Sequence, residues 1–259
     1  MNEMNAKTGF VTQIGMEYEE AFEIADDLGF DYVELMMDGA TERQHLDPDA
    51  VRARAEKCNI DLTVHLPFAL DIGSPFEYVR EGTIREVQTA VETANAFGAT
   101  KGVLHASSSA WKPAWDAEIV ASNIVESVRK IDGFADDLGF EICVENIPGG
   151  WFTIHDFDRI FDETNASMTL DTGHARIDGL DSGGMASFVG SHGDRISHFH
   201  LNDTRLARDE HLPFGSGTID FREIFGALPD DWDGTLSLEV FTLDYGYIET
   251  SKTSLDELL

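Results

Sequence analysis

The sequence predicts an α/β fold, a single (β/α)8 TIM barrel that takes in residues 1–259 as one domain. Eight short apolar stretches with strand character alternate with amphipathic helical stretches, which is typical of a parallel sheet. The length of 259 residues is common for one barrel of this kind. No glycine-rich GxGxxG turn follows the first strand, and this favours a closed barrel over an open dinucleotide-binding sheet.

The predicted strands are short runs rich in apolar and β-branched residues, and several carry a polar residue near their carboxyl end. In chain order they are TGFVTQ (8–13), DYVELM (31–36), DLTVHL (61–66), KGVLHA (101–106), FEICVEN (140–146), SMTLD (167–171), ISHFHL (196–201) and TLSLEV (235–240).

Helical periodicity fills most of the segments between these strands. The clearest helical stretches are Tyr18–Leu28, Pro48–Lys57, Phe76–Phe97, Trp115–Leu138 and His155–Glu163. The hexapeptide ADDLGF occurs at 25–30 and again at 135–140, and each copy leads into a strand that contains a Glu. We expect its Gly to end the helix in the left-handed conformation and its Phe to begin the return to the sheet.

Composition excludes several classes of protein. The hydrophobic content of 42% is enough for a sizeable core, which excludes a disordered chain. No run of about 18 apolar residues is present, so we expect no membrane span. The N-terminal residues MNEMNAKTGF lack a secretion-signal pattern, and we expect a cytoplasmic protein. Cys58 and Cys143 lack CxxC spacing and are expected to be free thiols.

The charge balance is strongly acidic, with 18 basic against 49 acidic side chains and a formal net charge of −31. Such an excess destabilises a compact protein through self-repulsion. At molar salt the Debye length shrinks to about 3 Å, and the repulsion is largely screened. Because the acidic residues are spread along the chain, we interpret them as the hydrated surface of a protein adapted to high salt, a halophilic protein.

Polar residues recur at the carboxyl ends of the predicted strands, where active sites of such barrels lie. Glu145 and Glu239 each stand in an otherwise apolar strand, and burying an unpaired carboxylate is costly. Each therefore requires a cation or a hydrogen-bond donor. A single His in a strand is usually a hydrogen-bonded core residue, but here five histidines and four carboxylates share one end of the barrel. Such a mixed set favours a divalent ion such as Zn²⁺ or Mn²⁺ over a purely structural network.

These residues resemble those of the xylose isomerase-like barrel superfamily, which contains sugar isomerases and epimerases, inosose dehydratases and endonucleases of the endonuclease IV type. The resemblance covers nearly the whole chain. In the sugar epimerases one metal is held by residues of strands five to eight, and these positions match Glu145, Asp171, His200 and Glu239. The resemblance implies that Glu145 and Glu239 are catalytic, moving protons on opposite faces of a carbon next to a carbonyl.

The endonuclease IV pattern is matched as well. That family holds three zinc ions with nine ligands, and the resemblance implies nine counterparts here: His65, His105, Glu145, Asp171, His174, His200, Asp209, His211 and Glu239. The number of metal ions implied is therefore one to three.

Departures from the nuclease pattern make an endonuclease the second hypothesis and a sugar isomerase or epimerase the first. The loop between NDT and DEH is shorter, Glu210 replaces an Arg, and Gly173 stands where the nucleases tend to carry Cys. Basic residues near the strand ends are few beyond Arg205 and Arg208, whereas duplex binding depends on phosphate contacts.

The leading hypothesis is a metal-dependent isomerase or epimerase of a small sugar or sugar phosphate. His174 and Arg205 or Arg208 are expected to bind substrate oxygens or a phosphate, and Glu34 is expected to reach the pocket or to pair with a cation. Three loop aromatic residues are expected either to cover the sugar or simply to pack within their loops: Trp111, Trp115 and Phe68. The alternative is an apurinic endonuclease, which alone implies a nucleic-acid partner; a third hypothesis is a metal-containing barrel that binds a ligand without turnover. Barrels of this group often pair, so a homodimer is among the expected assemblies.

Overall fold

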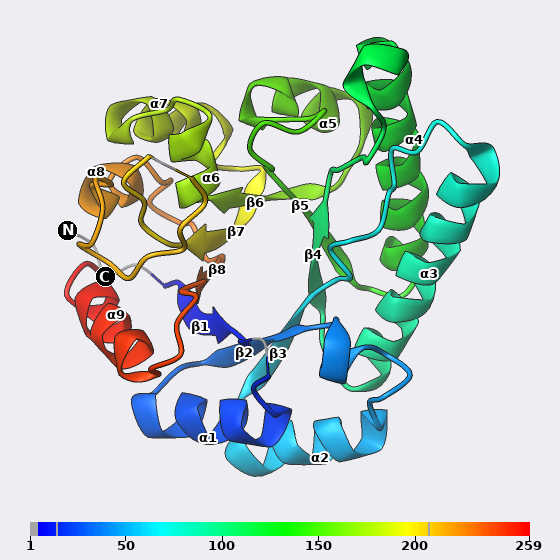
Figure 1. Ribbon diagram of the computed structural model, residues 1–259. Helices are drawn as coiled ribbons and strands as arrows, with labels where there is room; N and C mark the ends of the chain where they lie inside the picture. Colours follow the sequence, from blue (N-terminus) through cyan, green and yellow to red (C-terminus); the bar gives the residue numbers. More distant parts are fainter. Residues whose placement is uncertain (1–4, 14, 207) are drawn as a thin grey trace.

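The computed structural model describes residues 5–13, 15–206 and 208–259, and these residues form a closed barrel of eight parallel strands. The strands follow one another around the barrel in chain order, and β1 closes it by pairing with β8 (Figure 1). The predicted fold class is therefore confirmed. The strands are β1 (Lys7–Val11), β2 (Tyr32–Met36), β3 (Asp61–His65), β4 (Lys101–His105), β5 (Glu141–Glu145), β6 (Ser167–Asp171), β7 (Ile196–Leu201) and β8 (Thr235–Leu238).

Helices surround the barrel, and those of the amino-terminal half match the predicted stretches to within two residues. The predicted stretch His155–Glu163 divides into a 3-10 turn, η3, and α5. The helices are α1 (Tyr18–Leu28), α2 (Pro48–Cys58), α3 (Glu77–Ala96), α4 (Ala117–Asp136), α5 (Phe157–Glu163), α6 (Thr172–Ile177), α7 (Ser182–His192), α8 (Phe221–Phe225) and α9 (Gly246–Asp256), with 3-10 turns η1 (Gly39–Thr41), η2 (Lys112–Ala114) and η3 (Ile154–Asp156). No helix of the described chain is long and apolar enough to cross a membrane.

The repeated ADDLGF segment ends α1 and α4 in the same way. Gly29 and Gly139 have φ of 70° and 69°, a left-handed conformation that glycine adopts without strain. The amides of the following residues, Phe30 and Phe140, donate to the carbonyls of Ala25 and Ala135. Each turn directs the chain into the next strand, as the sequence predicts.

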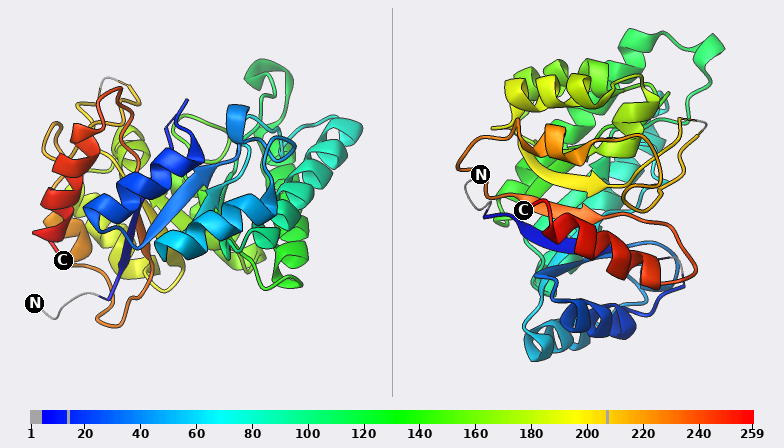
Figure 2. Two further views of the ribbon diagram at one scale, coloured as in Figure 1. Left: turned by 90° about the horizontal axis from the view of Figure 1, so that it is seen from below. Right: turned by 90° about the vertical axis from the view of Figure 1, so that its left-hand side faces the viewer.

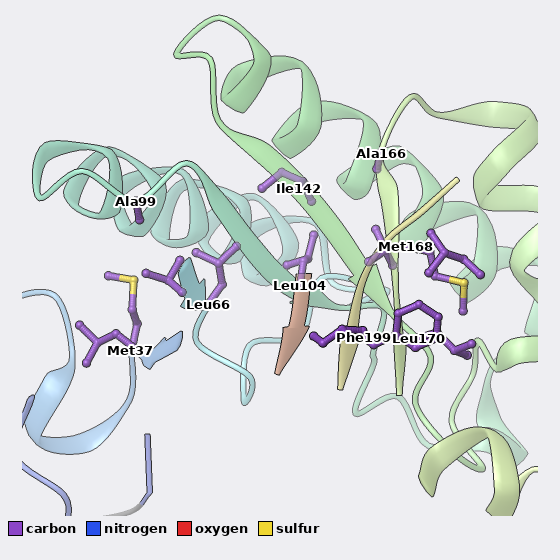
Figure 3. Close-up of a cluster of buried hydrophobic side chains, with 14 of the residues drawn as sticks. Met37, Leu66, Ala99, Leu104, Ile142, Ala166, Met168, Leu170 and Phe199 are labelled. Atoms are coloured by element: carbon purple, nitrogen blue, oxygen red, sulfur yellow. The ribbon is translucent and has the colours of Figure 1, made fainter. Parts of the chain in front are cut away.

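The apolar core lies between the outer face of the sheet and the helices, because alternate strand residues point outward to the helices. Figure 3 shows part of this layer, with Leu66, Leu104, Ile142, Met168, Leu170 and Phe199 labelled. The inward-facing residues are mostly polar. Lys101 of β4, for example, reaches across the barrel to Thr235 of β8, with its Nζ 3.0 Å from the Thr235 hydroxyl.

The carboxyl ends of the strands and the loops that follow them form one face of the barrel. The right-hand view of Figure 2 shows the arrows of β7 and β8 pointing toward the gold-coloured loop after β7, away from the two termini. Between β7 and α8 the described residues form no helix or strand apart from a bridge between Asp203 and Leu212. This irregular segment contains Asp209 and His211, two of the predicted ligands.

Candidate metal centre

Four buried residues from consecutive strand ends converge on one point. Glu145 and Asp171 end β5 and β6, His200 lies in β7, and Glu239 follows β8 directly. One potential ligand atom from each lies within 4.8 Å of the other three. Nδ1 of His200 is 3.2 Å from Oε1 of Glu145 and 3.3 Å from Oε2 of Glu239. We call these residues the four-ligand set, and they are the four at the centre of the sequence prediction.

A second set shares Glu145 with the first. It consists of His65 at the end of β3, His105 at the end of β4, and Glu145. The two Nε2 atoms of the imidazoles are 3.2 Å apart, and they lie 3.5 Å and 2.9 Å from Oε2 of Glu145. We call this the His65 set.

A third set joins α6 to the loop after β7. Nε2 of His174 and Nε2 of His211 lie 3.2 Å and 3.0 Å from Oδ2 of Asp209. Both histidines are buried, whereas the Asp209 side chain is 42% exposed. We call this the loop set. With it, the structure brings all nine predicted ligands into three neighbouring groups.

Two observations test whether these groups fit divalent ions. Oε2 of Glu145 and Oε2 of Glu239 are fully buried and accept no hydrogen bond, a costly arrangement for a carboxylate without a cation. In the His65 set the ligand atoms are 2.9 to 3.5 Å apart. Ligand atoms of a tetrahedral zinc site with bonds of about 2.0–2.1 Å lie roughly 3.3 Å apart. The mixed nitrogen and oxygen donors suit zinc or manganese.

Backbone carbonyls orient three of the histidines in the same way. In each ring Nδ1 lies within hydrogen-bond distance of a main-chain oxygen, which leaves Nε2 free to act as a ligand. The pairs are His65 with Leu66 (3.0 Å), His174 with Asn146 (2.9 Å) and His211 with Glu239 (3.2 Å). These Nε2 atoms are the ones that face the His65 set and the loop set.

Both carboxylate oxygens of Asp171 accept hydrogen bonds from neighbouring residues. It caps the amino terminus of α6, where Oδ1 accepts the His174 amide at 2.6 Å, and Oδ2 accepts Nδ2 of Asn202 at 2.7 Å. A Cβ atom at position 173 would lie 1.9 Å from Oδ1 of Asn202, so Gly173 makes room for this contact. Burial raises the pKa of Asp171 to about 7, although the nearby His174 opposes the shift.

The remaining carboxylates and imidazoles stabilise each other's charges. Burial alone would raise the pKa of Glu145 and of Glu239. The neighbouring histidines, chiefly His200, outweigh this effect and hold both pKa values well below the usual range. Burial disfavours the charged form of His211, yet Glu239 and Asp209 raise its pKa to about 11. Protons on His200 and His211 thus compensate the carboxylates in the metal-free protein. A divalent ion supplies the same positive charge when it replaces them.

A pocket of about 390 Å³ opens directly above these groups. Its polar lining consists of predicted ligands, and its remaining lining is apolar: Met36, Phe68, Ile147, Pro148 and Phe241. The Phe241 ring stacks on His211, with centroids 4.1 Å apart and planes at 16°. Ligand pockets typically combine apolar walls with a few convergent polar groups in this way.

The residues predicted to bind substrate are distributed differently. His174 and Phe68 line the pocket, whereas Arg205, Arg208 and Trp111 are absent from its described lining. Arg205 instead pairs with Glu210 at 3.0 Å. Trp111 is 72% exposed, and Trp115 packs against Phe76. A role of the two arginines and Trp111 in binding substrate therefore stays a prediction.

Sequence patterns did not predict which residues position the ligands, and Glu34, expected to reach the pocket or to pair with a cation, is absent from the described pocket lining and contacts His198 and His200. Asn146 and Asn202 fix Asp171 and His174, and Glu34 and His198 form a buried pair behind His200. Sequence signals were present, because Asn146 directly follows Glu145, Asn202 comes two residues after His200, and Glu34 interrupts an apolar strand.

Comparison with solved structures supports the same architecture. A D-tagatose 3-epimerase-like protein superposes with a TM-score of 0.84 over 97% of this chain and 96% of its own, at 24% identity. A D-allulose 3-epimerase from Methylomonas sp. gives 0.82 over 99% of both chains, at 19% identity. The 3-keto-D-glucoside 4-epimerase YcjR from E. coli gives 0.77 over 98% of both, at 19% identity. At these identities the likeness establishes a shared fold.

Sequence relatives extend across archaea and bacteria. The uncharacterized protein ML2432 of Mycobacterium leprae is 30% identical over 263 aligned positions, covering 93% of this chain and 90% of its own. The uncharacterized protein MJ1311 of Methanocaldococcus jannaschii is 29% identical, covering 81% and 74%. Residues 22–258 match the sequence profile of the xylose isomerase-like TIM barrels. The chain belongs to the xylose isomerase-like TIM barrel family.

Proposed function

We propose that this protein is a divalent-metal-dependent isomerase or epimerase of a small sugar or sugar phosphate. The observation that carries the proposal is the placement of Glu145 and Glu239. Both belong to the four-ligand set, both line the pocket, and each keeps one buried oxygen without a hydrogen bond. Two carboxylates at one substrate-sized pocket can remove a proton from a carbon and return it on another face.

A bound divalent ion would polarise the carbonyl and hydroxyl oxygens of a sugar and so acidify the C–H bond between them. Glu145 acts as the base that accepts this proton, Glu239 takes up a proton from solvent and delivers it to the carbon, and Glu145 then releases its proton to solvent. Both side chains are suited to start as carboxylates, because His200 holds their pKa well below the usual range. Phe68 and Phe241 line the pocket and offer apolar surface to the C–H face of the sugar.

The compared proteins support this class of reaction. The three superposed structures described above carry the names of a D-tagatose 3-epimerase-like protein, a D-allulose 3-epimerase and a 3-keto-D-glucoside 4-epimerase. A pocket of about 390 Å³ falls at the lower end of the range for small-molecule sites, as a monosaccharide requires.

The test is exchange of substrate hydrogen with solvent. Protein loaded with Mn²⁺ or Zn²⁺ is incubated in D2O with a panel of ketoses and their phosphates, and products are followed by NMR. We expect deuterium at the carbon next to the carbonyl together with a new stereoisomer or isomer. Glu145→Gln and Glu239→Gln serve as controls and abolish both signals. Unchanged sugars throughout the panel, with metal bound, would contradict the proposal and favour ligand binding without turnover.

A second candidate function is supported by the His65 set and the loop set. Together with the four-ligand set they provide for up to three ions, as expected of an apurinic endonuclease of the endonuclease IV type. The pocket walls disfavour this candidate, since no arginine or lysine is present in the described lining to bind DNA phosphates. Three zinc ions per chain together with nicking of an abasic duplex would establish the endonuclease; one ion and no nicking would exclude it.

A further inference from the structure

Glu34 is a fully buried carboxylate in the interior of the barrel, and it does not line the pocket. It lies in β2, on the far side of the barrel from β7, and it contacts two histidines of that strand. Oε1 lies 3.0 Å from Nε2 of His200, and Oε2 lies 3.0 Å from Nε2 of His198. The hydroxyl of Ser237 donates to Oε2 as well.

Glu34, His198 and His200 are close enough to hold an ion themselves. Hydrogen bonding explains their geometry better. Each imidazole nitrogen lies at hydrogen-bond distance from a different oxygen of Glu34. Both oxygens of Glu34 therefore have hydrogen-bond partners, whereas Oε2 of Glu145 and Oε2 of Glu239 accept no hydrogen bond. Glu34 acts here as an acceptor of two N–H bonds.

This arrangement determines which nitrogen of His200 is available as a ligand. Because Nε2 donates its hydrogen to Glu34, Nδ1 is the nitrogen that can bind a metal once its own proton is displaced, and it faces Glu145 and Glu239 at 3.2 and 3.3 Å. His65, His174 and His211 show the opposite orientation, with Nδ1 on a neutral backbone carbonyl and Nε2 free. Nδ1 of His174 and Nδ1 of His211 also lie 3.2 Å from Oε1 of Glu145 and Oε2 of Glu239, whereas His200 places its Nε2 on a carboxylate that belongs to none of the three sets.

A chain of hydrogen bonds fixes Glu34 from the other end of the barrel. Nδ1 of His198 lies 2.6 Å from the hydroxyl of Thr235, and that hydroxyl accepts a hydrogen bond from Lys101 at 3.0 Å. With Nε2 of His198 donating to Glu34, Nδ1 accepts the hydrogen of Thr235. Every donor in this chain has an acceptor, so the position of Glu34 is set by the barrel itself.

We propose that Glu34 is a positioning residue that makes Nδ1 of His200 the ligand atom, and that the four-ligand set is therefore the first to fill and the tightest of the three sets. The inference rests on the metal dependence contained in the proposed function. An anionic acceptor behind an imidazole increases the basicity of its free nitrogen more than a neutral carbonyl does. Loss of such an outer partner typically weakens metal binding about 10- to 100-fold.

The experiment is a metal titration of the full chain with Zn²⁺ against a competing chelator. Glu34→Gln keeps the side-chain shape but removes the charge and one acceptor oxygen. We expect its affinity for the first ion to fall about 10- to 100-fold. Glu34→Asp restores part of the loss because it restores the charge. Glu141→Gln is the matched control, since it neutralises a carboxylate at the opposite end of the barrel interior, and it leaves the affinity unchanged.

The possible results separate this inference from the proposed function. Wild-type affinity for the first ion in Glu34→Gln overturns the role of Glu34 and leaves the isomerase proposal intact. If Glu34→Gln loses affinity as expected but the wild-type protein converts no sugar, the role of Glu34 is supported and the isomerase proposal is contradicted. A wild-type protein that binds no divalent ion contradicts both.

A second measurement needs no variant. Long-range ¹H–¹⁵N NMR spectra of the zinc-loaded wild-type protein report which ring nitrogen of each histidine binds the metal. We expect His200 to bind through Nδ1 with its hydrogen on Nε2, and His65, when it is loaded, to bind through Nε2. Binding of His200 through Nε2 would overturn the inference even if the Glu34 variants failed to fold.

Discussion

The two ends of the barrel interior use charged residues in different ways. At the amino end Lys101 lies 3.4 Å from Glu141 and donates to Ser197 and Thr235, so a single cation meets a single carboxylate and three neutral oxygens. At the carboxyl end several carboxylates and imidazoles converge, and Oε2 of Glu145 and Oε2 of Glu239 lie 2.9 to 3.5 Å from imidazole nitrogens without accepting a hydrogen bond. Matched charges of the first kind stabilise the fold. Unmatched ligand atoms of the second kind indicate a site for a cation.

The largest effect is expected at Glu145, which belongs to both the four-ligand set and the His65 set. Glu145→Gln removes the charge of a shared ligand and the proposed base at once. We expect turnover to fall on the order of 10³-fold or more, within or beyond the range for loss of a general base. Steady-state kinetics with measured metal content checks this. Activity above a tenth of the wild-type value would show that Glu145 does not transfer the proton.

The pH dependence of stability should distinguish metal-free from metal-loaded protein. The pKa of His211 is raised to about 11, so its stabilising effect is complete below the unfolded value of about 6.5 and is lost as pH rises toward 11. Burial raises the pKa of Asp171 to about 7, so the stability that its protonated form contributes is likewise lost as pH rises from about 4 to 7. Between its unfolded and its folded pKa, each such group lowers the free energy of unfolding by about 1.4 kcal/mol per pH unit.

We therefore expect the free energy of unfolding of the metal-free protein to be lower at pH 9 than at pH 7. Zinc should reduce this difference, because the ion replaces the proton at the imidazoles. Urea unfolding at the two pH values, with zinc or with chelator, measures the effect. Equal pH dependence in both forms would mean that the buried histidines do not exchange protons for metal.

The loop set should contribute less than the set carried by the strands. Asp209 is 42% exposed and lies in the irregular segment after β7, so Asp209→Ala removes a ligand from a solvent-exposed part of the site. In zinc-loaded protein we expect one ion fewer per chain and a fall in sugar turnover of less than about tenfold. Elemental analysis after dialysis gives the ion count. An unchanged count would show that the loop set binds no metal.

The smallest effect is expected at the amino end. Glu141→Gln weakens the contact with Lys101 but keeps an acceptor for the Ser167 hydroxyl. We expect the free energy of unfolding to fall by about 1 kcal/mol or less, with metal content and turnover unchanged. Denaturant unfolding and elemental analysis test both parts. Loss of metal from this variant would mean that the two ends of the barrel are coupled.

Most of the fold and the ligands can be predicted from the sequence, because period-two strands place their last inward residues at one face of a parallel barrel. Glu145, Asp171 and His200 illustrate this. The contacts of Glu34 could not be predicted, since they depend on which residues meet across the barrel after closure. The pairing of Arg205 with Glu210 depends on the path of an irregular loop, which has no periodic pattern. The Gly- and Ser-rich helix α7 gave too weak an apolar pattern to be identified.

Anomalous diffraction from crystals grown with Zn²⁺ or Mn²⁺ tests the metal centre most directly. Data on both sides of the metal absorption edge locate each ion independently of the protein atoms. We predict a peak bonded to Glu145, Asp171, His200 and Glu239, at about 2.0–2.3 Å from each ligand atom. Saturating metal with no peak among these four residues would contradict the central claim, whatever ions lie elsewhere.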